Sequence, residues 1–333
     1  MSSAHPASHD VVAVGNAIVD VLAHADEAFL ESHGMAKGAM TLIDAGRADE
    51  IYRAMGPGVE CSGGSAANTA AVIAALGGRP AYIGKVRDDA LGEVFRHDIR
   101  NAGVAFACAP SDNGSTTARC LILVTRDAER TMNTYLGACR ELTEADVDAE
   151  LIAASQVAYL EGYLWDEASA KAAMKRACAV ARGAGREVAL SLSDPFCVNR
   201  HRAELQDLVK GEVDILFANE DEALALFESA DFDAAVSALR PHVKIAAITR
   251  GAKGCVVIAG NATFTVATQP IYDVVDTTGA GDAFAAGFLR AHTMGFAPDV
   301  CGRLGNLAAG RIITHFGARP ERPMADLYVQ ATA

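Results

Sequence analysis

Residues 275–290 read VDTTGAGDAFAAGFLR and place a glycine-rich turn directly before an apolar helical segment. Within this segment Phe284 and Phe288 recur at i and i+4, the spacing at which side chains share one face of a helix. The residues at the start of the predicted helix are Gly279, Ala280 and Gly281. The preceding residues read as the end of a strand. The stretch therefore predicts a strand–turn–helix junction, the unit from which α/β folds are built.

Short apolar runs alternate with longer helical patterns on both sides of this junction. Residues 65–78 (SAANTAAVIAALGG), 91–103 (LGEVFRHDIRNAG) and 168–185 (ASAKAAMKRACAVARGAG) each read as a helix that ends at glycine, with a strand-like run nearby. Such alternation is typical of a mostly parallel sheet with helices on both faces. We therefore expect a three-layer α/β/α fold.

Two segments interrupt the alternation, residues 16–45 and 105–135. They read as extended, for example TTARCLILVT at 116–125, with no helical pattern between the extended runs. We expect antiparallel strands there, forming a small sheet that is attached to the main layer as a lid. Because no repeat or proline-rich linker divides the chain, residues 1–333 are expected to form a single domain that carries this lid.

Composition and charge exclude several function classes. The chain has 333 residues and a formal net charge of −13, so no nucleic-acid partner is expected, because neutralising phosphates requires clustered Lys and Arg. The eight cysteines include no CxxC pair, which argues against a zinc site or a disulfide framework and indicates a reducing cytosol. The first ten residues lack the regions of a signal peptide, and no apolar run could cross a membrane. We expect a cytoplasmic protein, either a monomer or a homodimer.

Two common phosphate-binding signatures are absent. No glycine is followed by Lys-Ser or Lys-Thr, as a P-loop requires, and a GxGxxG pattern that starts at Gly279 fails at Phe284. The free N–H groups of a helix N-terminus can bind an anion instead, and the glycine-rich turn provides one. The carboxylate of Asp282 follows directly and could take the proton of an attacking hydroxyl, as a base does in phosphoryl transfer. The alternative is an ordinary tight turn in which Asp282 only complements the helix dipole.

Two further polar groups suggest contacts to a hydroxylated ligand. In CSGGSAANTA (61–70), Gly63 and Gly64 allow the backbone to approach a ligand, and Asn68 offers a donor and an acceptor. In VGNAIVDV (14–21), Asn16 and Asp20 follow a strand and could bind a pair of vicinal hydroxyls. Helix caps and capped turns would explain both groups equally well.

Two pairs of oxygen-bearing side chains could hold cations. Asp276 and Thr278 could ligate a cation or fix the turn before the helix. Asn219 and Glu222, in FANEDEALAL (217–226), could hold Mg2+ through waters. The same pair also fits a capping box, and the two interpretations can hold together.

Taken together, these stretches resemble the ribokinase-like (PfkB) family of carbohydrate and nucleoside kinases. DTTGAGDAFAAGFL (276–289) is similar to the second signature of that family, and SGGSAANTAAVIAALGG (62–78) followed by YIGKVRDDALGE (82–93) is similar to the first. NEDEA, TRGAKG and GNLAAGRIITHFGA complete the set in the family's order, so the resemblance covers nearly the whole chain. It implies a ribokinase-like fold, with ATP and Mg2+ as cofactors and K+ as a further candidate.

The resemblance also implies a role for each candidate residue. Asp282 would be the catalytic base, the 279–281 turn the anion hole, and Arg130 the lid arginine that reaches toward the phosphates. The ATP site would include Thr249, Gly251 and Asn306. Asn219 and Glu222 would organise Mg2+, and Asp276 with Thr278 would lie near a monovalent-cation site. The sugar hydroxyls would be held by Asp20, Gly63, Gly64 and Asn68.

Within the family, residues 15–44, DILFANEDEA and LSLSDPF look closer to the adenosine kinase branch than to ribokinase or fructokinase. Asn16 and Asp20 would then lie at the ribose, and Tyr163, Leu164 and Trp165 are candidates for a wall against the purine, with ordinary core packing as the alternative. The expected reaction transfers the γ-phosphate of ATP to the 5′-hydroxyl of adenosine. The alternatives are a sugar kinase that acts on ribose, fructose or a sugar acid, and a non-catalytic nucleoside-binding regulator.

Overall fold

The structure of this protein, a computed structural model, describes residues 7–127 and 129–333. Residues 1–6, which form most of the stretch judged to lack a signal peptide, and residue 128 in the predicted lid lie outside this range. The strands of the described residues are β1 (His9–Val14), β2 (Ile18–His24), β3 (Met40–Leu42), β4 (Val59–Gly63), β5 (Pro80–Ile83), β6 (Ala105–Phe106), β7 (Ala118–Val124), β8 (Arg130–Tyr135), β9 (Ser155–Glu161), β10 (Glu187–Ser191), β11 (Ile215–Asn219), β12 (Ile245–Thr249), β13 (Cys255–Ala259) and β14 (Ala262–Val266).

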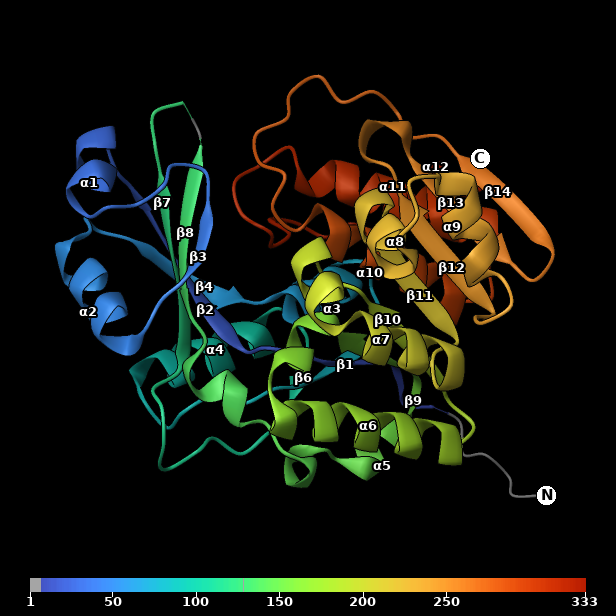
Figure 1. The fold of residues 1–333 in the computed structure, drawn as a ribbon, viewed down its shortest axis with the longest axis horizontal. Coiled ribbons are helices and arrows are strands. Elements are labelled where there is room, and N and C mark those ends of the chain that lie inside the picture. Colours follow the sequence, from blue (N-terminus) through green and yellow to red (C-terminus); the bar gives the residue numbers. More distant parts are fainter. Residues whose placement is uncertain (1–6, 128) are drawn as a thin grey trace.

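The helices connect and cover these strands (Figure 1). The α-helices of the described residues are α1 (Glu27–Ser32), α2 (Ala45–Ala54), α3 (Ser65–Ala75), α4 (Ala90–Asn101), α5 (Ala149–Ala153), α6 (Ala168–Gly183), α7 (Pro195–Gly211), α8 (Glu220–Phe227), α9 (Phe232–Leu239), α10 (Ala280–Thr293), α11 (Pro298–Ile312) and α12 (Leu327–Thr332). Short 3-10 helices are η1 (Gly137–Glu141), η2 (Glu144–Asp146), η3 (Gly162–Asp166) and η4 (Gly251–Lys253). As predicted, α3, α4 and α6 are each followed within two residues by a glycine with positive φ.

The large sheet has the strand order β14-β13-β12-β11-β10-β9-β1-β5-β6 in the described part of the chain. The strands from β12 to β6 run parallel, and β13 and β14 form an antiparallel edge. The expected mostly parallel sheet is confirmed.

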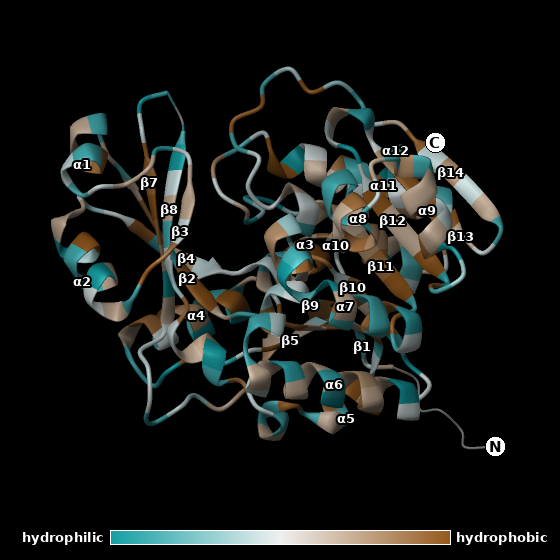
Figure 2. Cartoon of the chain, viewed as in Figure 1, coloured by the Kyte–Doolittle hydropathy of each residue, from teal (hydrophilic) through white to brown (hydrophobic). Residues whose placement is uncertain are grey.

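Two hydrophobic cores lie on opposite faces of this sheet, because successive side chains of a strand point to opposite faces. On β1, Val11 and Ala13 join a core with residues of α3, α4, α10 and α11. The alternate residues Val12 and Val14 join a core with residues of α6, α7, α8 and α9. Figure 2 shows the strands of the large sheet predominantly brown and the helices around them with mixed teal and brown surfaces. The three-layer α/β/α architecture is therefore confirmed.

A smaller sheet with the order β3-β8-β7-β2-β4 lies beside the large one, and α1 and α2 cover its far side (Figure 1). All of its strands were expected to be antiparallel, but they are not. The pairs β2–β4 and β7–β8 are antiparallel, whereas β2–β7 and β3–β8 are parallel. Long stretches of chain separate the members of the parallel pairs, so neither pair is constrained by a hairpin turn.

The boundaries of the smaller sheet also differ from the sequence pattern. Strand β4 (Val59–Gly63) belongs to it, whereas β6 (Ala105–Phe106) pairs with β5 in the large sheet. Helix α1 lies inside a segment that was expected to be extended throughout. The carboxylate of Asp26 caps this helix by accepting a hydrogen bond from the amide of Phe29, a local signal that the extended pattern obscured.

The topology creates a natural ligand site between β1 and β9. Strands β9 to β12 are added on one side of β1, and β5 and β6 on the other. In open α/β sheets, ligands bind outside the carboxyl ends of the strands where the strand order reverses in this way. The carboxyl ends of β1 and β9 carry Val14 and Glu161, respectively.

Two further expectations can be compared with the fold. No helix of the described residues is long and apolar enough to span a lipid bilayer. All eight cysteines are free, and most of them are buried.

Candidate active site

Helix α10 begins at the glycine-rich turn, as the sequence predicts. Gly279 has φ +76°, and a Cβ at this position would lie 2.5 Å from the Cβ of Ala318, so only glycine fits without strain. A Cβ on Gly281 would meet no atom within 4 Å, so the space beside the helix start is open.

Not all three amides of this turn are free. The N–H of Ala280 donates to the carbonyl of Thr277 at 3.2 Å. The amides of Gly279 and Gly281 make no backbone hydrogen bond within the described chain. The candidate anion hole therefore consists of two amides and the positive end of the helix dipole, rather than the three amides that the sequence suggested.

The Asp282 carboxylate is held by α3. Its Oδ1 accepts from Ser65 Oγ at 2.6 Å and its Oδ2 accepts from Asn68 Nδ2 at 3.0 Å. The hydroxyl of Thr69 donates to the Asp282 carbonyl at 3.2 Å. The starts of α3 and α10, distant in the sequence, are thus joined at this carboxylate.

Burial raises the pKa of Asp282, while the hydrogen bonds from Ser65 and Asn68 and the charge of Arg319 lower it. The net direction is upward. A carboxylate that is partly desolvated yet held by donors is a common arrangement for a general base, because its basicity increases while its orientation is fixed.

Asn16 and Glu161 bridge the carboxyl ends of β1 and β9. Asn16 Nδ2 donates to Glu161 Oε1 at 2.8 Å, and the amide of Ala66 donates to Glu161 Oε2 at 2.9 Å. Glu161 is 1% exposed, and burial raises its pKa to about 7. Glu161 was not among the residues predicted from the sequence. The available signal was a charged residue at the end of the buried strand VAYLE.

The glycines at 63 and 64 are explained by close approaches. A Cβ on Gly63 would lie 2.3 Å from Asp20 Oδ2, and a Cβ on Gly64, which has φ +93°, would lie 2.1 Å from the Asn16 carbonyl oxygen. Burial raises the pKa of Asp20 to about 7, against the opposing effect of two nearby arginines. The structure therefore brings Asn16, Asp20, Gly63 and Gly64 together, and Asn68 joins them to Asp282.

Arg130 links the smaller sheet to the turn before α10. Its Nη1 donates to Thr278 Oγ1 at 2.9 Å, and its Nη2 forms an ion pair with Asp276 Oδ2 at 2.5 Å. Its guanidinium lies over the ring of Phe316, with 4.3 Å to the centroid. Asp276 also accepts from the amides of Thr278 and Gly317 at 3.0 and 2.8 Å. In this structure the oxygens proposed for a monovalent cation are engaged by protein donors and fix the turn.

Asn219 and Glu222 form the capping box that was the alternative to a metal site. Asn219 Oδ1 accepts from the Glu222 amide at 2.8 Å, and the Glu222 carboxylate accepts from Asn219 N at 2.9 Å and Nδ2 at 2.7 Å. Glu222 is buried, and this burial raises its pKa to about 7, with Asp194 and Asp221 adding in the same direction. The carboxylate thus lies in a negative environment without a cationic partner among the described residues.

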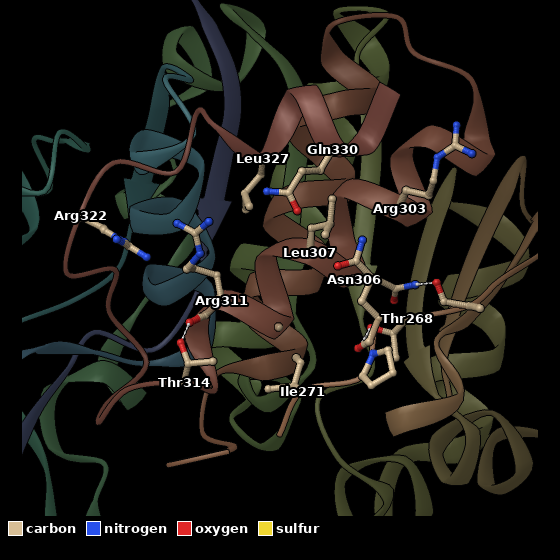
Figure 3. Close-up of a pocket in the computed structure, with 14 residues that line it drawn as sticks. Thr268, Ile271, Arg303, Asn306, Leu307, Arg311, Thr314, Arg322, Leu327 and Gln330 are labelled. Carbon is tan, nitrogen blue, oxygen red and sulfur yellow. Dashed lines mark hydrogen bonds between the residues drawn. The ribbon is translucent and has the colours of Figure 1, made fainter. Parts of the chain in front are cut away.

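The three residues expected along an ATP site are only partly brought together. Thr249 ends β12 and Gly251 follows it with φ +56°. Asn306 lies on α11, where its Nδ2 donates to the Val266 carbonyl at 3.1 Å. Asn306 lines a pocket of about 380 Å³ between residues 267–271 and α11, but Thr249 and Gly251 do not (Figure 3).

The expected purine wall is divided between core and surface. Leu164 and Trp165 are 2% and 1% exposed and belong to the core beneath α6 and α7. Tyr163 is only partly buried, and its hydroxyl lies 3.4 Å from the Ser193 carbonyl. Phe196, in the first turn of α7, is 76% exposed. An exposed aromatic ring near the carboxyl edge of the sheet is a further candidate for contact with a ligand, which the sequence pattern did not identify.

Comparisons with known proteins extend these observations. Residues 38–324 match the profile of the pfkB family carbohydrate kinases. Among solved structures, the chain is similar to an adenosine kinase from Sinorhizobium meliloti (53% identity, TM-score 0.90, 98% of this chain and 100% of that one). It is similarly close to a probable sugar kinase from Rhizobium etli CFN 42 (48% identity, TM-score 0.91, 98% and 99%). Fructokinase-1 from Oryza sativa subsp. japonica is 30% identical over 239 residues, 70% of this chain and 74% of that protein.

Proposed function

The chain belongs to the pfkB family of carbohydrate kinases, and we propose that it transfers the γ-phosphate of ATP to the 5′-hydroxyl of a nucleoside, with adenosine as the preferred acceptor. Membership of the family makes it a phosphotransferase that acts on an alcohol group. The observation that carries the chemistry is the Asp282 carboxylate, oriented by Ser65 and Asn68 next to the open N-terminus of α10.

In this mechanism Asp282 accepts the proton of the acceptor hydroxyl as the oxygen attacks the γ-phosphorus. Ser65 and Asn68 hold the carboxylate in one orientation, so that little reorganisation is needed at the moment of transfer. The raised pKa of Asp282 makes it a stronger base than an exposed aspartate. Below that pKa the carboxylate is protonated and the reaction should slow.

Negative charge on the transferred phosphoryl group is stabilised by the start of α10. The amides of Gly279 and Gly281 and the helix dipole are fixed in place before the charge develops, which is the efficient form of electrostatic catalysis. Arg130 adds a guanidinium from the smaller sheet. We propose that this sheet is a lid, that Arg130 exchanges Asp276 for the phosphates of ATP, and that closure excludes water from the reaction.

The residues around Glu222 fit a divalent cation. The buried carboxylate has no cationic partner in the described chain, and its neighbours are also negative. Because both Glu222 oxygens accept from Asn219, Glu222 and Asn219 would hold Mg2+ through waters. No group of three or more His, Cys, Asp or Glu side chains in the described chain could hold a metal by itself. When bound, Mg2+ neutralises charge on the β- and γ-phosphates.

The acceptor would lie at the reversal of strand order between β1 and β9. Asp20 offers a carboxylate and Asn16 an amide to the ribose hydroxyls, and Gly63 and Gly64 let the backbone approach closely. Tyr163 and Phe196 are aromatic candidates for contact with a purine, whereas Leu164 and Trp165 lie in the core. The pocket beside Asn306 is the candidate site for the adenine of ATP.

A second candidate function, phosphorylation of a free sugar, is favoured by the fructokinase relatives at 28–30% identity. The higher identity to the Sinorhizobium meliloti adenosine kinase supports the nucleoside. Formation of ADP with adenosine, inosine, ribose and fructose as acceptors, at equal ATP and Mg2+, separates the two. We expect the highest kcat/KM with adenosine. A preference for fructose or ribose would establish the sugar kinase instead, and binding of adenosine without ADP formation would support a non-catalytic regulator.

A further inference from the structure

Arg319, in the segment after α11, fastens the segment that carries the two donors to Asp282. Its Nε donates to the Ser62 carbonyl at 2.7 Å, and its Nη1 donates to the Ala67 carbonyl at 2.8 Å. These two carbonyls lie on either side of Gly63, Gly64 and Ser65. One planar guanidinium therefore fixes both ends of the turn between β4 and α3.

The segment around Arg319 also contacts the turn before α10. Ala318 packs so closely on Gly279 that a Cβ there would lie 2.5 Å from the alanine Cβ, and the Gly317 amide donates to Asp276 at 2.8 Å. Residues 317–319 thus touch both elements that meet at Asp282, namely α10 and the β4–α3 turn. A displacement of this segment would change the relative position of the base and its donors.

The charge of Arg319 is directed toward the same site. Its Nη2 is buried without a hydrogen-bond acceptor among the described residues. The acidic groups that its charge influences come from different elements, Asp20 on β2, Asp98 on α4 and Asp282 on α10. The other titratable groups that interact with these carboxylates or with Arg319 include Cys61, Tyr82, Cys120, Arg130, Tyr159, Glu161 and Tyr163.

We propose that Arg319 is a positioning residue for phosphoryl transfer, which clamps residues 62–67 so that Ser65 and Asn68 hold the Asp282 carboxylate and which supplies the compensating charge for that carboxylate. The proposal rests on the kinase function proposed above, and it assigns Arg319 no contact with substrate. In agreement with this role, its positive charge lowers the pKa of Asp282 against the effect of burial.

The clamp and the charge can be separated by two substitutions. Arg319→Lys keeps a positive charge but lacks the planar fork that bonds two carbonyls at once. Arg319→Met removes both. We expect Arg319→Lys to lower kcat by about 10-fold or more, with the acid limb of the kcat/KM pH profile close to that of the parent. In Arg319→Met, loss of an opposite charge should also move that limb to higher pH by about 1 unit.

Arg290 provides the matched control. It is a largely buried arginine that pairs with Asp10 and also donates to the Tyr328 hydroxyl and the Gly77 carbonyl. Arg290→Met should lower the melting temperature but leave the pH profile unchanged. If Arg319→Lys and Arg319→Met, folded at the assay temperature, keep the parent kcat and acid limb, or if Arg290→Met moves the limb equally, the proposal is refuted.

Hydrogen exchange tests the clamp without reference to activity. The amides of residues 63–69 should exchange at least about 10-fold faster in Arg319→Lys than in the parent, and Arg290→Met should leave them unchanged. Unchanged exchange at these amides would refute the clamp even if no acceptor is phosphorylated. If exchange is faster in Arg319→Lys and the parent shows no kinase activity, the clamp exists and the proposed function is wrong. If Arg319→Met does not fold, Arg319→Lys alone decides the outcome through these readouts.

Discussion

Substitution of Ser65 by alanine should move the pH dependence of catalysis without removing the base. Ser65 Oγ donates to Asp282 Oδ1 at 2.6 Å and lowers the pKa of this carboxyl. A hydrogen bond to a charged group contributes about 1.5–3 kcal/mol, and one pKa unit corresponds to about 1.4 kcal/mol. Loss of this donor should therefore raise the pKa of Asp282 by about 1–2 units. A water molecule that replaces the hydroxyl would reduce the shift, so about 1 unit is the working expectation.

The sign of the effect on rate follows directly. The base must be ionised to act, so raising its pKa moves the acid limb of kcat/KM to higher pH. The assay is ADP formation with the best acceptor, from about pH 5 to about pH 9, for parent and Ser65→Ala. The values of kcat/KM for the parent and Ser65→Ala should differ less on the alkaline plateau than on the acid limb.

Thr69→Val is the matched control for this experiment. The Thr69 hydroxyl lies 3.2 Å from the backbone carbonyls of both Ser65 and Asp282, and it makes no hydrogen bond to the Asp282 carboxylate. The substitution removes a hydroxyl from the same helix at nearly the same place, and it should leave the acid limb unmoved. A limb that stays in place in Ser65→Ala, or shifts equally in Thr69→Val, would refute the assignment of Ser65 as a donor that tunes the base.

Three other perturbations have defined outcomes. Gly279 has φ +76° and a Cβ there would lie 2.5 Å from the Cβ of Ala318, so Gly279→Ala should lower the free energy of unfolding, measured by urea titration, by about 1–3 kcal/mol. A Cβ on Gly281 meets no atom, so Gly281→Ala should change it by less than about 1 kcal/mol. Burial raises the pKa of Glu161 to about 7, compared with about 4.3 in an unfolded chain, so the native state binds more protons between these values and the free energy of unfolding should fall as pH rises from about 4 to about 7. Glu161→Gln should reduce this fall, measured as the urea midpoint at each pH, and an equal fall in the variant would contradict the assignment. Arg130→Met should lower kcat by at least about 10²-fold and should also lower the melting temperature, because it leaves Asp276 without its cationic partner. A folded variant with the parental kcat would exclude a role for Arg130 at the phosphates.

The sequence predicted the parts of the fold that depend on local patterns. Helices α3 and α4 begin and end, and α10 begins, close to the expected residues because glycines and i, i+4 apolar spacing are local signals. Alternation of strands and helices predicted the parallel layer. Strand pairing in the smaller sheet was less accessible, since β2 pairs with β7 across a long stretch of chain and no local pattern specifies that register.

In the candidate site too, residues with a local sequence signal could be predicted and residues defined by long-range contacts could not. Asp282 and the glycines at 63, 64 and 279 could be identified because a turn before a helix has a sequence signature. Glu161 and Arg319 could not, because their importance arises from neighbours that are distant in the chain, Asn16 and Ala66 for the one and Ser62 and Ala67 for the other.

Core packing decided one case that the sequence left open, and the structure shows the capping box in another. Leu164 lies in the core rather than in an exposed wall, because the 3-10 helix η3 places it among core residues of α6 and α7. At Asn219 the capping box is formed, and this arrangement is compatible with a water-mediated cation as well. In both cases the alternatives differ in tertiary surroundings and not in residue type.

The role of Asp282 as the base is tested by the turnover of Asp282→Asn under saturating ATP, Mg2+ and acceptor. The substitution keeps the size of the side chain and an oxygen that can accept from Ser65, but it removes the proton acceptor. The account predicts a loss of at least about 10²-fold in kcat, with a melting temperature close to that of the parent. A folded Asp282→Asn variant that turns over at nearly the parental rate would contradict it.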